Sequence, residues 1–303
     1  MTAFGYALSS EEQPPEELVR LARRAEEVGF DFAMISDHYH PCPLMRIHPA
    51  IIAQAAATTA RLFDGRFSLG VGAGENLNEH ILGHAWPEPQ RRLEMLEEAI
   101  GLMRRLWGGE TVTQRGRFYT VVQARIFTLP AQPPPILVAA SGPESASLAG
   151  RAGDGLVGTA PDEKLVGAFE EAGGARRPRY GQIGVCYARS EKSARKTVLE
   201  GWPNAALSGD VPWELKTVEL IEEAVKRVRE EDLEDIVCGP DLDGYLEAIE
   251  RFAGAGYDHV YLHQIGPEQD AFLEFCEEEL LPAALASANG NRRRKRKERQ
   301  STR

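Results

Sequence analysis

The chain has 303 residues, of which 43% are hydrophobic, 27% charged and 8% aromatic, as in a folded protein of one large domain or two small ones. A net charge of -11 argues against nucleic acid as the main ligand of the folded part. No apolar run approaches the roughly 20 residues of a membrane helix. The N-terminus lacks the basic and apolar regions of a secretory signal, so we expect a cytoplasmic protein.

The charge is unevenly distributed along the chain. Residues 292–303 carry eight basic side chains and one acidic, a net charge of +7. Residues 1–291 hold 45 acidic and 27 basic side chains, a net charge of -18. We therefore expect residues 289–303 to be a disordered basic tail, separate from the folded body, that binds polyanions only non-specifically.

The cysteines do not suggest a metal or disulfide framework. Cys42, Cys186, Cys238 and Cys276 lie far apart in the sequence and form no CxxC pair. The spacing predicts reduced thiols, no zinc site and no bound metal.

Short apolar runs typical of strands alternate with amphipathic runs typical of helices, the pattern of a parallel β/α protein. Expected strands are 4–8, 32–36, 66–71, 136–140, 156–159, 183–187, 235–238 and 259–264, and expected long helices are 15–28, 48–63, 91–107, 242–255 and 269–281. No GxGxxG follows the first strand, which favours a TIM barrel over a doubly wound sheet. We expect one barrel domain over 1–288, with a hairpin insertion near 111–130 and a second insertion near 202–232.

Polar and small residues follow three of the expected strands, where barrel enzymes place their chemistry. Asp37 and His38 end the second strand, and 72–78 (GAGENLN) follows the strand at 66–71. An Asp-His pair with a distant glutamate can supply a base and a separate acid for alcohol oxidation by hydride transfer. This spacing is weakly specific, because a histidine at a strand end is more often structural. The third segment, 139–143 (AASGP), fits an anion site or a plain tight turn equally well.

Several longer runs carry a family resemblance. Five runs occur in this order along the chain: SDH, HPAIIAQAAATTARLFDGRFSLGVGAGENLNE, RRLEMLEEAIGLMRRLWGG, GRFYTV and AASGPESASLAGRAGDG. Together they resemble the luciferase-like flavin- and deazaflavin-dependent oxidoreductases, and more narrowly the branch of the coenzyme F420-dependent glucose-6-phosphate dehydrogenases. The resemblance covers nearly all of residues 3–285.

The resemblance implies an enzyme with a TIM barrel that binds F420 across its mouth. His38 matches the base that takes the hydroxyl proton as hydride leaves the substrate, and Glu75 matches the general acid at the ring. Asp37 would orient His38. The implied cofactor contacts are Asp37, Gly74, Asn78, Ala139, Ala140, Ser141 and Gly142, the last four at the cofactor phosphate.

The sequence departs from the family pattern after SDHYHP. Cys42 stands where the family has a tryptophan, and the third strand, of the type RLRLGTxV with a cis peptide, is missing between Pro41 and Pro43. About 30 residues, one β/α unit, are absent. The barrel should then have seven strands. Either the second strand pairs directly with the one at 66–71, or two edges stay open.

A second departure concerns the substrate. Gly184, Leu233 and Asp270 or Ala271 stand where the glucose-6-phosphate enzymes have lysine and arginine. We therefore expect an uncharged alcohol, or an enone-type acceptor reduced in reverse, in place of glucose 6-phosphate. Two alternatives remain at this stage: an FMN-dependent monooxygenase, and a catalytically impaired member of the family. Relatives of this fold commonly form homodimers.

Overall fold

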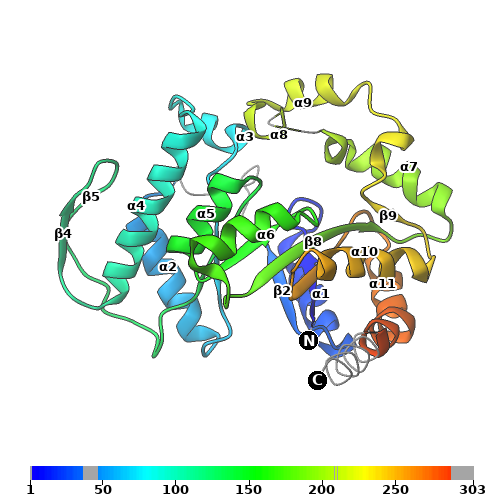
Figure 1. Cartoon of the computed structure of the whole chain (residues 1–303), viewed down its shortest axis with the longest axis horizontal. Helices are drawn as coiled ribbons and strands as arrows, with labels where there is room; N and C mark the ends of the chain where they lie inside the picture. The colour runs from blue at the N-terminus through cyan, green and yellow to red at the C-terminus, as the bar shows by residue number, and fades with distance from the viewer. Residues whose placement is uncertain (1, 37–46, 208, 210, 288–303) are drawn as a thin grey trace, which may run out of the picture.

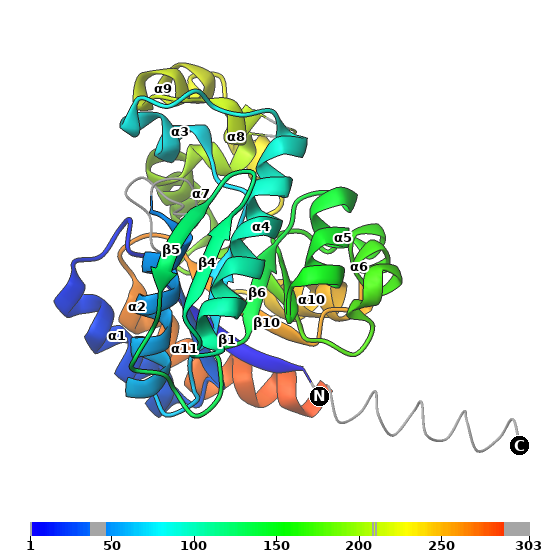
Figure 2. The same ribbon diagram turned by 90° about the vertical axis from the view of Figure 1, so that its left-hand side faces the viewer.

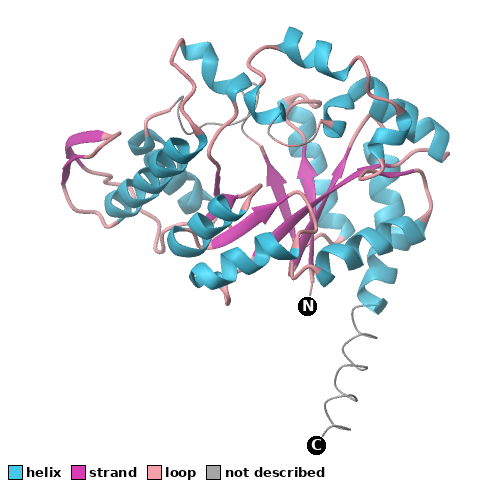
Figure 3. Cartoon of the chain, turned by 45° about the horizontal axis from the view of Figure 1, so that its top comes forward, coloured by secondary structure: helices cyan, strands magenta, loops and turns pink. Residues whose placement is uncertain are grey.

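The computed structural model describes residues 2–36, 47–207, 209 and 211–287. Its centre is a curled parallel sheet whose strands follow one another in the order β2-β1-β10-β8-β7-β6-β3 (Figures 1 and 3). The strands are β1 Ala3–Leu8, β2 Phe32–Ile35, β3 Leu69–Val71, β6 Ile136–Ala139, β7 Gly155–Gly158, β8 Arg179–Cys186 and β10 His259–Gln264. A short strand, β9 Val237–Cys238, pairs with the end of β8 outside this path. The predicted α/β class and the incomplete barrel are confirmed.

The gap in this barrel lies where the sequence lacks its third unit. Strands β2 and β3 stand at the two ends of the strand order, and no backbone pairing joins them among the described residues. Direct pairing of these two strands, one of the two outcomes considered for the shortened barrel, is therefore wrong. The sheet remains open along one side, with the carboxyl ends of its strands on the same edge.

Helices cover the outer face of the curled sheet (Figure 1). Helix α1 shows why they form: Pro15 occupies its first turn, four apolar residues at helical spacing are buried, and Gly29 ends it at φ 102°. The long helices are α1 Pro15–Val28, α2 Pro49–Leu62, α4 Pro89–Trp107, α5 Pro143–Ala152, α7 Glu191–Gly201 and α10 Leu242–Gly254. The shorter ones are α3 Asn76–Glu79, α6 Glu163–Phe169, α8 Val211–Glu214, α9 Val218–Val225 and α11 Gln269–Phe275. In the described parts of the chain, no helix is long and apolar enough to cross a membrane.

An antiparallel hairpin projects from the side of the body, within the segment 111–130 (Figure 1). It consists of β4 Val112–Arg115 and β5 Thr120–Ala124. The Glu98 carboxylate on α4 accepts hydrogen bonds from the backbone N–H groups of Arg117, Phe118 and Tyr119 at 3.0, 3.1 and 2.8 Å. These three bonds fix the hairpin turn to α4.

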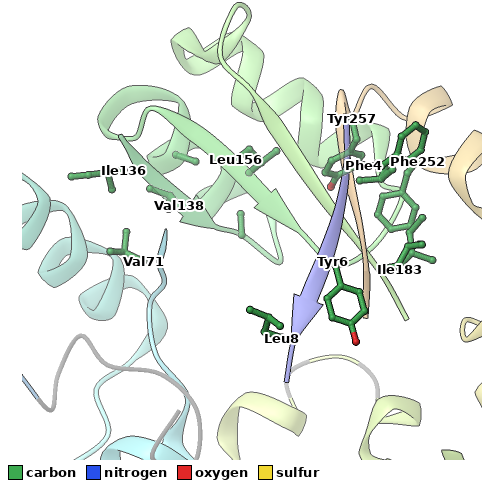
Figure 4. Packing of buried hydrophobic residues seen from close by; sticks show 14 of the residues in the cluster. Phe4, Tyr6, Leu8, Val71, Ile136, Val138, Leu156, Ile183, Phe252 and Tyr257 are labelled. Carbon is green, nitrogen blue, oxygen red and sulfur yellow. The ribbon is translucent and has the colours of Figure 1, made fainter. Parts of the chain in front are cut away.

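The sheet packs on both faces. Phe4, Tyr6 and Leu8 of β1 belong to the main core under the helices, and Figure 4 shows Phe4 beside Tyr257 and Phe252. The opposite, inner face carries a smaller cluster built from Leu137, Val157 and Tyr261, with Phe32 and Tyr180 packed against it.

Gly5 makes room for this inner cluster. The Phe32 ring lies 5.3 Å from that of Tyr180 and 6.4 Å from that of Tyr261, centroid to centroid. A Cβ atom on Gly5 would stand 2.3 Å from the Phe32 ring. The ring therefore lies directly over β1, on the inner face of the edge strand β2.

We predict that Gly5→Ala lowers the free energy of unfolding by about 1–3 kcal/mol, because the new methyl group forces the Phe32 ring to move. Gly70→Ala on β3 is the matched control, because a Cβ there meets nothing within 4 Å. Urea denaturation of both variants measures the difference. Adding Phe32→Leu to Gly5→Ala should recover part of the loss. Equal stability of the two alanine variants would contradict this account.

Candidate active site at the carboxyl ends of the strands

The loop after β3 turns sharply so that Glu75 precedes the short helix α3. Gly74 has φ +84°, a left-handed conformation that favours glycine. A Cβ at this position would also stand 3.3 Å from the Glu79 carboxylate and 3.4 Å from the Trp86 ring. Gly74 is therefore needed for the turn and for the close packing beneath it, and both place Glu75 at the edge of the sheet.

The Glu75 carboxyl is set to exchange a proton near neutral pH. Burial raises its pKa to about 7, the nearby Glu11 charge adds to the rise, and a hydrogen bond from Asn78 opposes it. That bond runs from Asn78 Nδ2 to Glu75 Oε2 at 3.0 Å, and Asn78 is completely buried. A carboxyl group with such a pKa can act as a general acid or base.

Glu11 lies on the loop after β1, and its carboxylate contacts the end of β2. It accepts hydrogen bonds from Ser9 Oγ at 3.0 Å and from Ser36 Oγ at 2.8 Å, so this loop is joined to the end of β2. Its charge acts on Glu75 and on His263, at the end of β10. Burial lowers the pKa of His263, whose ring meets Trp202 edge-on with centroids 5.2 Å apart.

Glu11 and His263 were missed by the sequence analysis. Both stand at the carboxyl end of an expected strand, which is the signal that could have identified them. Asp37 and His38 lie outside the described residues, as does Cys42. The structure describes Ser36 immediately before them, at the end of β2 beside Glu11.

The turn from β6 into α5 adjoins the loop that carries Glu75. A Cβ on Gly72 would be 3.5 Å from that of Ala139. Ser145 Oγ accepts from the Gly142 N–H at 3.2 Å and donates to the Gly142 carbonyl at 2.9 Å, which closes the first turn of α5. A Cβ on Gly142 would meet nothing within 4 Å, so there is open space beside this turn. A helix N-terminus with open space can receive an anion.

The arrangement thus places a titratable carboxyl group and a turn suited to an anion on adjacent strand ends. Ala139 ends β6, and Ala140, Ser141 and Gly142 form the turn before α5, so four of the predicted residues are neighbours by sequence and fold. Among the described residues, no group of three or more His, Cys, Asp or Glu side chains is placed to hold a metal ion.

The sequence matches a known family over most of its length. The model of the family described as luciferase-like monooxygenase matches residues 41–259. An F420-dependent glucose-6-phosphate dehydrogenase of Microbacterium testaceum is 34% identical over 325 residues, covering 92% of this chain and 96% of that protein. The chain belongs to the luciferase-like family. The enzyme of the same description from Amycolatopsis mediterranei is 32% identical and covers 94% of this chain and 99% of its own.

Solved structures of the luciferase-like family share this fold. An F420-dependent secondary alcohol dehydrogenase in complex with an F420-acetone adduct is 27% identical, with a TM-score of 0.86 over 93% of this chain and 99% of that one. The F420-dependent tetrahydromethanopterin reductase from Methanopyrus kandleri, at 20% identity and TM-score 0.74, supports the fold alone.

The luciferase-like relatives also bear on the missing unit. The alignment with the Microbacterium protein runs over 325 positions, whereas this chain has 303 residues. That relative therefore contains residues with no counterpart here. This agrees with a sheet whose two edge strands flank the place of the absent strand.

The raised pKa of Glu75 predicts how the free energy of unfolding depends on pH. Its pKa is raised from 4.5 to about 7, so the folded protein holds this proton more tightly than the unfolded chain. Its stabilising contribution is complete below pH 4.5 and is lost as the pH rises through about 7. Relative to wild type, Glu75→Gln should therefore gain about 3 kcal/mol of unfolding free energy between pH 4 and pH 8.

Urea denaturation at the two pH values measures this gain. Glu16→Gln on the exposed face of α1 is the control for the loss of a glutamate charge. The assignment fails if the Glu75→Gln and Glu16→Gln variants show the same pH dependence.

Proposed function

We propose that this protein is an oxidoreductase that transfers hydride between an uncharged alcohol or carbonyl compound and coenzyme F420. The observation that carries the proposal is the Glu75 carboxyl group, with a pKa of about 7, on the strand end next to the Ala139–Gly142 turn. Relatives named as F420-dependent dehydrogenases match the chain over more than nine-tenths of its length, which supports the choice of cofactor.

The described residues fit F420 at its phosphate end and beside its ring. The first turn of α5, with open space at Gly142, would hold the phosphate through backbone N–H groups. On the inner face of β3, a Cβ on Gly70 would also meet nothing within 4 Å, so there is open space beside this strand. When bound, F420 supplies the acceptor or donor of hydride at its deazaflavin ring.

In this proposal, side chains of the protein itself accept and donate the protons. In alcohol oxidation, His38 would take the hydroxyl proton, oriented by Asp37, and Glu75 would deliver a proton on the cofactor side. Asn78, predicted as a cofactor contact, is completely buried and donates to Glu75 Oε2. This bond favours a role for Asn78 in orienting the Glu75 carboxyl.

The substrate is uncharged in this proposal, because no cationic side chain replaces the phosphate-binding lysine and arginine at the three matched positions. Leu233 is buried in an apolar cluster, and a Cβ on Gly184 would be 3.5 Å from Ile236. Asp270 forms an ion pair with Arg20 of α1 at 2.8 Å. The secondary alcohol dehydrogenase among the structural neighbours supports the same class of substrate.

Titration with F420 and with FMN tests the cofactor. We expect F420 to bind with a dissociation constant in the micromolar range and to raise the unfolding temperature, because a ligand that binds only the folded state stabilises it. FMN should give little effect. Preferential FMN binding would favour the monooxygenase alternative. Binding of neither would indicate that the open side between β2 and β3 impairs the site.

Turnover tests the proposed residues and the substrate class. His38→Ala and Glu75→Gln should each lower kcat by roughly 10²–10⁴-fold, the range for general acid-base groups, with F420 affinity nearly unchanged. Simple secondary alcohols should be oxidised, and glucose 6-phosphate should give no saturable rate. Saturable oxidation of glucose 6-phosphate would overturn the substrate proposal. Full activity of both variants would overturn the assigned roles.

A further inference from the structure

The inserted segment near 202–232 is attached to the body on two sides of the candidate site. At its start, the Trp202 ring packs edge-on against His263, at the end of β10. Further along, α8 packs against α3, immediately after Glu75 (Figures 1 and 2). The segment therefore connects the end of β10 with the loop after β3.

Glu214, the last residue of α8, makes the contacts that hold the second attachment. Its carboxylate accepts a hydrogen bond from the Trp86 indole N–H at 2.9 Å and another from Arg92 Nη1 at 3.0 Å. Arg92 Cζ lies 4.1 Å from the centroid of the Trp86 ring, a cation-π contact. The three side chains form one cluster, in which Trp86 comes from the segment before α4 and Arg92 from α4 itself.

Arg92 explains why an acidic residue stands at this position. Its side chain is in the first turn of α4 and only 8% of the residue is exposed. A guanidinium group removed from water requires a charged or polar partner. The Pro87 carbonyl accepts one hydrogen bond from Arg92 Nη1, and Glu214 supplies the negative charge, from 122 residues further along the chain.

The same cluster contacts the residues on each side of Glu75. Asn76 Nδ2 donates to the backbone carbonyl of Glu214 at 2.9 Å. On the other side of Glu75, the tip of the Trp86 ring is 3.4 Å from the place of a Cβ on Gly74. The backbone of Glu75 is thus held between two contacts that both depend on the position of α8 and Trp86.

We propose that Glu214 is a positioning residue for Glu75, which it serves by fastening the inserted segment to the loop after β3. Its effect on catalysis rests on the proposed function, whereas its effect on the loop does not. Glu214 touches neither the substrate nor the cofactor in this role. Loss of its carboxylate releases α8 and Trp86, and the loop that carries Glu75 then loses its fixed geometry.

The experiment compares Glu214→Gln and Trp86→Phe with the wild-type full chain. Glu214→Gln removes the charge and one acceptor, and Trp86→Phe removes the indole donor together with the ring tip that approaches Gly74. Glu222→Ala, an exposed glutamate of the same inserted segment, is the matched control. Hydrogen exchange of the backbone amides at 74–80 should become at least about threefold faster in Glu214→Gln and in Trp86→Phe, and should remain unchanged in the control.

Kinetics with F420 separate positioning from general structural damage. Glu214→Gln should lower kcat by about 10- to 100-fold, with F420 affinity within about twofold of wild type. Because Glu214 acts through Glu75, the double variant Glu75→Gln/Glu214→Gln should be no slower than Glu75→Gln alone. The proposal would be overturned if Glu214→Gln lowered kcat by the same factor in the Glu75→Gln variant as in the wild-type protein. Unchanged hydrogen exchange at 74–80 in both single variants would also overturn it.

The two proposals can fail separately. If the wild-type protein binds F420 but transfers no hydride, the proposed function is wrong. The hydrogen-exchange comparison then still decides whether Glu214 fastens the loop, because it needs neither cofactor nor substrate.

Discussion

The parallel direction of the strands is the constraint on which the site depends. Every strand in the path from β2 to β3 runs the same way, so the loops that follow the strands meet at a single edge. Glu11, Glu75, His263 and the Ala139–Gly142 turn are far apart in the sequence and stand together only for this reason. Loss of one β/α unit opens the curl, yet it does not reverse any strand. The remaining loops therefore keep their common edge.

The electrostatics at this edge follows from the burial of the Glu75 carboxyl group near the exposed Glu11 carboxylate. Glu11 lies close enough to raise the pKa of Glu75, and the same charge opposes the effect of burial on His263. Folding the chain thus costs free energy at this edge above neutral pH. The apolar packing on both faces of the sheet must offset that cost. Functional sites commonly trade stability for reactivity in this way.

Much of this arrangement could be predicted from the sequence, because it depends on local patterns. Helical spacing of apolar residues located α1, α4 and α10, and the glycine-rich run after β3 located Glu75. The start of β8 at Arg179 was missed, since the run RRPRYGQ resembles a loop and its tyrosine faces the inner aromatic cluster. The Glu214 contacts were also missed. They join residues 122 and 128 positions apart, and no local pattern marks such a pair.

The hairpin on α4 has a consequence for how the sequence can vary. Glu98 holds the turn through backbone N–H groups, which every residue except proline possesses. These hydrogen bonds therefore do not require particular side chains at 117–119. They do require the Glu98 carboxylate, because no other side chain has the same length and charge. Replacements of Arg117 or Phe118 by any residue except proline should accordingly preserve these hydrogen bonds, whereas replacements of Glu98 should not.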